Sequence, residues 1–295
     1  MRLLALFILS SFFMNFNLIG QIPSSSVYLL QPSGVSSTSI EYEQPKYLTN
    51  YNPKGYNNHP FFIDDDRLII SSKLPDQAEP DLYELNTAAE TLKKLTQTVS
   101  GEYSVALLPP ANKLTFIRQE NFEDETLIRV WEFPNDNFGP GKPLFPHLTN
   151  TGYHCWLNSD QVVLFIVEDQ NRLVLTDREG LNFTTITEYP GRCFKILPNG
   201  RLIYFSDIPG EGPMLKIFNP NTNSRLPLIK PIGEVQDFEV VDEAIIMAKG
   251  KKIFISNWNL EAPEWKEFSN LEWIPGNQIT RMAISNNGQL AIVME

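Results

Sequence analysis

Residues 196 to 205 are Ile-Leu-Pro-Asn-Gly-Arg-Leu-Ile-Tyr-Phe, an apolar run, an Asn-Gly turn and a second apolar run. Asn-Gly readily adopts the left-handed backbone of a tight hairpin turn, so this stretch predicts a β-hairpin. Five other stretches repeat the pattern in weaker form, with Asp, Asn, Ser or Pro near the turn. They span residues 62–70, 108–116, 156–164, 238–247 and 284–292. The chain therefore contains six predicted hairpins.

The hairpins recur at a nearly constant interval. The second strands open at Leu68, Leu114, Val162, Leu202, Ala244 and Leu290, which lie 46, 48, 40, 42 and 46 residues apart. Most hairpins are followed by a third strand-like stretch, at 81–85, 126–133, 172–176, 214–218 and 252–256, and several by a fourth, at 92–96, 183–187 and 265–268. Four strands at this interval are typical of one propeller blade. The sequence predicts an all-β, six-bladed β-propeller with four-stranded blades.

The final repeat stops at Glu295 after two strands, and its missing half is found at the other end of the chain. Residues 26–31 resemble the third strand at 81–85, and residues 46–49 resemble the close of the fourth strand at 94–96. An unpaired sheet edge invites aggregation, so we expect these N-terminal strands to complete the last blade. Residues 21–295 should then form one domain.

Two irregular stretches and the first twenty residues fall outside this repeat. Residues 33–43 and 135–146 are expected to be surface excursions. Arg2, the apolar stretch from Leu3 to Phe13 and a small residue, Gly20, before the cleavage point have the order of a secretory signal peptide. A membrane anchor is the alternative, but polar residues interrupt the stretch, and a span needs about 20 largely apolar residues. We expect residues 1–20 to be removed, leaving a secreted or periplasmic monomer with no membrane span.

The net charge and the two cysteines limit which partners and cross-links the chain is expected to have. Lys and Arg number 24 against 35 Asp and Glu, giving a net charge of −11 that repels nucleic acid and anionic lipid. No nucleic-acid partner is expected. Cys155 and Cys193 lie on inner strands of neighbouring repeats, two residues out of register when the hairpins are aligned. Buried free thiols are the preferred interpretation, and a disulfide between them stays open because its distance limits are tight.

The first repeat carries a polar signature beside its apolar positions. His59 to Lys73 contains an acidic turn between two strands and a Ser-Ser-Lys exit, followed by Asp-Leu-Tyr at 81–83 and Lys-Leu-Thr at 94–96. This repeat resembles the TolB-type propeller repeat, whereas the others keep the turn and lose most of the polar positions. The resemblance implies a propeller that binds a protein or a component of the cell envelope. Propellers host many unrelated activities, so it informs the fold more than the function.

The residues suggest no convergent catalytic set. Three histidines, His59, His147 and His154, are few for a metalloenzyme, and neither a metal nor a cofactor is expected. His154 and Cys155 are adjacent on a strand, where side chains alternate between faces, so they do not form a thiolate–imidazole pair. The acidic triplet at 64–66 has the composition of a calcium loop, but its alignment with the other hairpin turns explains it without a metal.

Three classes of function remain. The preferred one is a non-catalytic propeller that binds a protein or envelope component through one face. The alternative is an enzyme acting on polysaccharide or peptide at the mouth of the central channel. The candidate channel residues, all on or beside inner strands, are His59, His154, Arg192, Asp237 and Arg281. Trp258 and Trp273 fall in or near loops, and are candidates for an exposed aromatic surface of the kind that a sugar-binding module uses.

Overall fold

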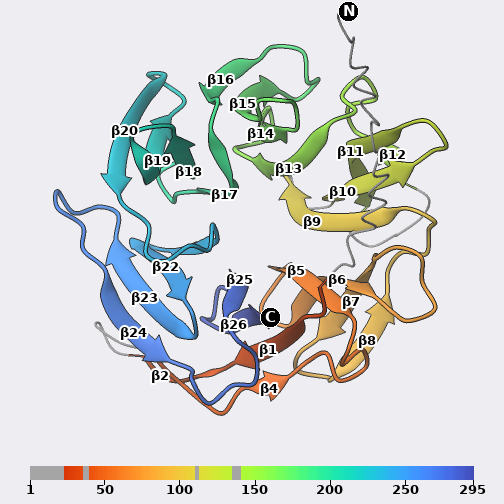
Figure 1. The fold of residues 1–295 in the computed structure, drawn as a ribbon, viewed down its shortest axis with the longest axis vertical. Helices are drawn as coiled ribbons and strands as arrows, with labels where there is room; N and C mark the ends of the chain where they lie inside the picture. The colour runs from red at the N-terminus through yellow and green to blue at the C-terminus, as the bar shows by residue number, and fades with distance from the viewer. Residues whose placement is uncertain (1–22, 36–39, 110–112, 135–140) are drawn as a thin grey trace, which may run out of the picture.

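The computed structural model of the chain describes residues 23–35, 40–109, 113–134 and 141–295. The predicted signal peptide at residues 1–20 lies outside these ranges. Six four-stranded antiparallel sheets form a closed ring, which confirms the predicted six-bladed propeller (Figure 1). Within the described ranges, no helix has the length and apolar character needed to cross a membrane.

Each sheet is one blade, whose strands follow one another from the central channel outward. Blade 1 contains β5 (Tyr56–Phe62), β6 (Arg67–Lys73), β7 (Asp81–Asn86) and β8 (Thr91–Lys94). Blade 2 contains β9 (Gly101–Leu108), β10 (Lys113–Asn121), β11 (Thr126–Pro134) and β12 (Lys142–Pro143). Blade 3 contains β13 (Thr151–Trp156), β14 (Gln161–Ile166), β15 (Arg172–Asp177) and β16 (Thr184–Thr187).

The second half of the ring follows the same order. Blade 4 contains β17 (Pro190–Ile196), β18 (Leu202–Ile208), β19 (Gly212–Asn219) and β20 (Ser224–Ile229). Blade 5 contains β21 (Phe238–Val241), β22 (Ala244–Lys249), β23 (Lys252–Asn257) and β24 (Lys266–Asn270). Blade 6 contains β25 (Ile279–Ile284), β26 (Leu290–Met294), β1 (Ser26–Leu30) and β4 (Lys46–Tyr47).

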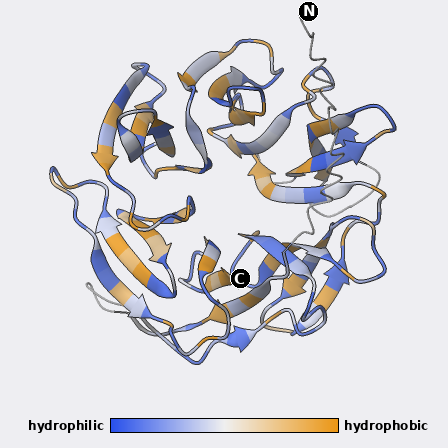
Figure 2. Ribbon diagram, in the orientation of Figure 1, coloured by the Kyte–Doolittle hydropathy of each residue, from blue (hydrophilic) through white to orange (hydrophobic). Residues whose placement is uncertain are grey.

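The core lies between neighbouring blades. The second strand of a blade is covered by a neighbouring blade on each face, and all five residues of β26 are buried. Between blades 3 and 4, Val163, Leu175, Phe194 and Tyr204 belong to one apolar cluster. Figure 2 shows hydrophobic residues concentrated on the strands and hydrophilic residues on the loops between them. Because the strands pack on both faces, they carry continuous apolar runs, as the hairpin sequences do.

The ring closes through the two ends of the chain. Strand β1 pairs with β26 over five residues, from Ser26 opposite Met294 to Leu30 opposite Leu290. Strand β4 extends the blade outward, and the Tyr28 and Tyr47 rings stack at 5.1 Å between centroids. The predicted completion of the last blade by N-terminal strands is confirmed.

Both expected surface excursions contain strands. Pro32–Val35 (β2) and Ile40–Tyr42 (β3) pair as a hairpin, and the Tyr42 ring meets Phe268 of blade 5 edge-on at 6.4 Å. The outer strand of blade 2, β12, falls within 135–146, where we expected irregular structure. Strands of two to four residues with prolines carry too little alternation to be recognised from sequence.

The acidic turn of the first repeat joins blade 1 to blade 6. Asp64 Oδ1 accepts hydrogen bonds from the backbone N–H groups of Asp66 and Arg67, at 3.1 and 2.9 Å. Asp65 Oδ1 accepts from the Asn287 N–H at 2.9 Å. The triplet therefore forms a hairpin turn, as its alignment with the other turns predicts, and also an interblade contact.

Candidate functional site

Every blade contributes at least one polar side chain to a deep cavity on the propeller axis. The cavity measures about 110 Å³ and is lined by His59, Ser104, Tyr153, Arg192, Asp237 and Arg281, one from each blade in order. All six lie near the start of an inner strand, where the strands of successive blades converge. We call these six residues the channel ring.

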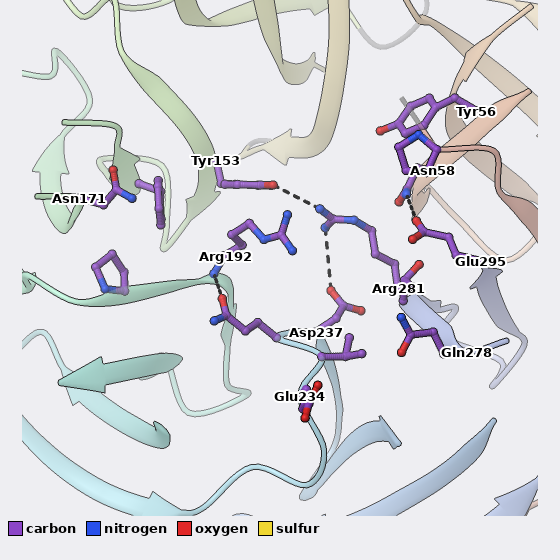
Figure 3. Close-up of a pocket in the computed structure, with 16 residues that line it drawn as sticks. Tyr56, Asn58, Tyr153, Asn171, Arg192, Glu234, Asp237, Gln278, Arg281 and Glu295 are labelled. Atoms are coloured by element: carbon purple, nitrogen blue, oxygen red, sulfur yellow. Dashed lines mark hydrogen bonds and ion pairs between the residues drawn. The ribbon is translucent and has the colours of Figure 1, made fainter. Parts of the chain in front are cut away.

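A wider cavity of about 860 Å³ opens above the channel ring, and we call it the channel mouth. It shares Tyr153, Arg192, Asp237 and Arg281 with the deep cavity. Four amide side chains also line it: Asn58, Asn171, Gln236 and Gln278. Figure 3 shows the two arginines directed toward the centre of this space from opposite sides.

Arg281 is held by two other members of the ring. Its Nη2 donates to Tyr153 Oη at 3.2 Å, and its Nη1 lies 3.9 Å from Asp237 Oδ1 (Figure 3). Asp237 Oδ2 accepts the Met282 backbone N–H at 2.8 Å. Burial raises the pKa of Asp237, although Arg281 and Lys195 counteract this effect. The carboxylate is therefore oriented by the backbone and only loosely engaged by the guanidinium.

Arg192 differs from the other charged members of the ring. Its backbone N–H donates to Gln236 Oε1 at 3.4 Å, and the residue is exposed to the channel mouth. Among the residues that the structure describes, none forms a hydrogen bond or ion pair with its guanidinium. Within the described ranges, Arg192 is thus a cation of the ring without a side-chain partner.

His59 lies in a strained segment of the inner strand. A bulge interrupts the β5–β6 register between Asn58 and Phe61, and His59 has φ 54°. Ser104, the ring member of the next blade, has φ 48° and shares a hydrogen bond of 2.9 Å with His59 Nδ1. Positive φ at residues other than glycine is costly and concentrates at functional sites. A second bulge interrupts the β9–β10 register between Tyr103 and Ala106, and the side chains of His59 and Ser104 both line the deep cavity.

The electrostatic surroundings keep His59 neutral. Burial lowers its pKa well below 6.5, and the positive charges of Arg281 and Arg192 lower it further. The imidazole packs against two aromatic rings, with centroid distances of 5.6 Å to Tyr103 and 6.3 Å to Tyr153. At neutral pH His59 is therefore a hydrogen-bonding group without charge.

A second charged pair lies along the channel wall next to the ring. Lys195 Nζ is 2.5 Å from Glu239 Oε1, which joins blade 4 to blade 5. Burial would lower the pKa of Lys195, but the Glu239 carboxylate raises it above its ordinary value. Lys195 lines the deep cavity as a stable cation.

The structure brings four of the seven residues predicted from sequence into one site. His59, Arg192, Asp237 and Arg281 belong to the channel ring. His154 also borders the deep cavity, but its Nε2 shares a hydrogen bond of 2.7 Å with Thr115 in blade 2. Burial lowers the pKa of His154 to about 3. His154 is a neutral core residue.

The two tryptophan candidates lie outside this site. Trp258 is only 9% exposed, and its indole N–H donates to the Asp242 carbonyl at 2.9 Å. It packs between blades 4 and 5 and offers no free ring for stacking. Trp273 is 51% exposed and lines neither the mouth nor the deep cavity.

The cysteines are both free thiols. Cys193 Sγ donates to the Phe238 carbonyl at 3.3 Å. Burial raises the pKa of Cys155 to about 11 and raises that of Cys193 further. The sequence left open whether Cys155 and Cys193 form a disulfide, and in the structure they do not.

Sequence reasoning missed three residues of the site: Ser104, Tyr153 and Lys195. Ser104 and Tyr153 precede the opening of their second strands by nearly the same number of residues as His59 does. Aligning the inner strands on this position would have identified the ring. In the described part of the chain, no three His, Cys, Asp or Glu side chains are grouped so that they can hold a metal ion.

Comparison with solved structures places this architecture among known propellers. A putative TolB from Agrobacterium tumefaciens superposes with a TM-score of 0.66 at 12% identity, covering 92% of this chain and 98% of the other. TolB from Acinetobacter baumannii gives 0.58 at 12% identity, covering 94% of this chain and 65% of the other, so the match spans about two thirds of that protein. An oligogalacturonate lyase in complex with manganese gives 0.57 at 12% identity, over 85% and 79%.

The chain thus has the fold of a TolB-like six-bladed propeller. No protein-family model matches it, and neither does any curated protein. At 12% identity these likenesses describe the fold alone, because one propeller architecture serves proteins with unrelated activities.

Proposed function

We propose that this chain is a secreted or periplasmic propeller without catalytic activity, which binds a segment of a partner protein or envelope component at the channel mouth. The size and continuity of the cavities on this face carry the proposal. The channel mouth, of about 860 Å³, adjoins a second cavity of about 1080 Å³, and Tyr56 lines both. Together they have room for several residues of an extended segment, more than a single small ligand needs.

The chemistry of the mouth suits a polypeptide. Its four amide side chains offer both donors and acceptors to a peptide backbone. Pro23, Phe165, Pro190 and Val235 provide apolar surface between these polar groups. A mixed surface with a few fixed polar groups is typical of sites that recognise protein segments.

An enzyme acting on polysaccharide or peptide at the same mouth is the second candidate, and the fold likeness to an oligogalacturonate lyase is the reason to test it. General acid–base catalysis works best with a pKa near the operating pH. Burial and two arginines hold the pKa of His59 far lower, and burial raises the thiol pKa values. These shifts make His59 and the two thiols poor acid–base groups at neutral pH.

Site-specific photocrosslinking in the native host tests the proposal. A benzophenone amino acid replaces Gln278 or Glu234, two exposed residues of the mouth, in separate variants. Arg201, exposed in a hairpin turn at the opposite end of the inner strands, is the control position. We expect one defined partner from both mouth positions and none from position 201. Equal crosslinking at all three positions, or none at the mouth, contradicts the proposal.

Two further measurements separate the alternatives. Fractionation should recover the mature chain outside the cytoplasm, shortened near Gly20, and a full-length cytoplasmic protein would contradict the predicted secretion. Incubation of the purified protein with oligogalacturonate and with peptides should leave both substrates intact. Product formation that is lost on substitution of His59 would establish the enzymatic alternative.

A further inference from the structure

The deep cavity is positively charged within an acidic protein. Among the described residues, Arg192, Lys195 and Arg281 line it together with one carboxylate, Asp237. Glu239 pairs with Lys195 at 2.5 Å, so the three cations and two carboxylates leave one net positive charge. His59 adds no charge, because burial and the two arginines hold its pKa well below 6.5. The chain as a whole has a net charge of −11. A cationic chamber with low-dielectric walls concentrates field and attracts anions.

The two arginines have unused hydrogen-bonding capacity. In the part of the chain that the structure describes, Arg192 donates from its backbone alone. Arg281 donates from Nη2 to Tyr153, and its Nη1 is 3.9 Å from Asp237. That separation is an ion-pair distance but too long for a hydrogen bond. A guanidinium presents five donors in a planar fork that matches a carboxylate. An incoming carboxylate therefore finds donors on two sides of the channel.

The size of the chamber restricts what enters it. The channel mouth has about 860 Å³, whereas the chamber at the ring has about 110 Å³. The mouth accommodates a backbone segment, and the chamber accommodates one short side chain that points down from it. An Asp or Glu side chain meets both the size and the charge of the chamber, whereas a sugar ring is a poorer fit.

We propose that the channel ring binds the carboxylate of an Asp or Glu side chain of an inserted protein segment, between Arg192 and Arg281. This inference rests on the proposed function, because it specifies which residue of the bound segment enters the channel. Asp237 is a weakly engaged counter-ion of Arg281, and the ligand carboxylate replaces it as the partner of that guanidinium. Tyr153 and the Asp237–Met282 backbone bond hold the two sides of the site in place.

The probe is N-acetyl-aspartate amide, with N-acetyl-asparagine amide as the uncharged control and galacturonate as a sugar carboxylate. His59 reports binding, since a carboxylate beside Arg192 and Arg281 offsets their positive charge and raises the His59 pKa. The other groups around His59 are Ser104 and the rings of Tyr56, Tyr103 and Tyr153. The chain has three histidines, so labelled imidazole signals are resolved by NMR.

The decisive variants are Arg192→Gln and Asp237→Asn, with Arg201→Gln as control. Arg192 and Arg201 are both exposed, so neither change should disturb folding. Loss of one charge-assisted hydrogen-bonding group should weaken binding of the aspartate probe about tenfold or more in Arg192→Gln. Asp237→Asn, which removes the competing carboxylate, should bind the probe more tightly than the unchanged protein does. Arg201→Gln should be unaffected.

Equal affinity for the aspartate and asparagine probes, or an unchanged affinity in Arg192→Gln, overturns the inference. If galacturonate binds through Arg192 and the aspartate probe does not, the carboxylate does not come from a protein side chain. The ligand is then an acidic sugar. The partner captured by photocrosslinking separates this failure from failure of the proposed function. If the partner binds Arg192→Gln as well as the unchanged protein, the carboxylate site is wrong while the binding role stands. If no partner is captured, the probe titration still tests the ring.

Discussion

Arg281 of blade 6 donates a hydrogen bond of 3.2 Å to the Tyr153 hydroxyl of blade 3, on the opposite side of the channel. The guanidinium also lies 5.7 Å from the centre of the Tyr153 ring. This contact joins residues 128 positions apart and crosses the axis of the ring, so it depends on the complete propeller.

Tyr153→Phe removes the acceptor of this cross-channel bond while keeping the ring. We expect a loss of about 1 kcal/mol in the free energy of unfolding, because Arg281 is largely buried and keeps only its loose contact with Asp237. Urea denaturation measures the change. Tyr189→Phe is the control, since no side-chain hydrogen bond is found for Tyr189 among the described residues. Equal effects of the two substitutions would contradict the structural role of the bond.

Blade closure makes the two ends of the chain mutually dependent. Deleting residues 21–50 removes β1 and β4, exposes the edge of β26 and uncovers the cluster around Val27 and Leu29. We expect aggregation or a protease-sensitive protein, because an unpaired strand edge and an apolar face become accessible. Size-exclusion chromatography and limited proteolysis detect both. A soluble monomer with an unchanged melting temperature would rule out the shared blade.

A single substitution tests the same closure more gently. Leu29→Ala should cost about 2 to 5 kcal/mol, since Leu29 is fully buried between blades 6 and 1. Leu92 of β8 is 41% exposed, and Leu92→Ala should cost far less. Urea denaturation of both variants and of the unchanged protein measures the two losses in the free energy of unfolding, which are then compared. Residues 142–143 form the outer strand of blade 2, so a deletion within 135–146 is expected to be mild only if it leaves these two residues in place.

Acidification should destabilise the propeller through His154. Burial lowers its pKa from 6.5 to about 3, so between these values the unfolded chain binds a proton that the folded chain does not. The contribution of His154 to the free energy of unfolding is complete above about pH 6.5. It falls as the pH decreases, by up to about 1.4 kcal/mol per pH unit. His154→Gln should flatten the dependence of urea midpoints between about pH 7 and pH 4. Equal slopes in the unchanged protein and in His154→Gln would refute the assignment.

The thiols should be inert in the native protein. Burial raises the pKa of Cys155 to about 11 and that of Cys193 further, and the thiolate is the reactive form. Ellman's reagent should label neither residue at neutral pH and both after unfolding in denaturant. The mass of the unreduced, unfolded and alkylated protein should show two modified cysteines. One disulfide in that measurement would contradict the free thiols.

The hairpin pattern was enough to predict the propeller, the number of blades and the pairing of residues 26–31 with the C-terminal hairpin. These features are local, or repeat at a fixed interval, because each hairpin carries its own turn and its own apolar strands. The outer strand Lys142–Pro143 was missed, because two residues give no periodicity. Trp258 was placed near a loop, as it is, but its burial depends on blades 4 and 5 meeting around it.

The channel ring was decided by tertiary structure. The sequence identified His59, Arg192, Asp237 and Arg281 as residues on or beside inner strands. Nothing local indicates that Arg281 bonds Tyr153, or that Arg192 has no such partner among the residues described. Those facts depend on how the six blades meet, and the positions of His59 and Ser104 in the channel lining coincide with a bulge in each of their strands. Repetition along the chain determines each blade, whereas contacts across the axis exist only when all six blades have closed around it.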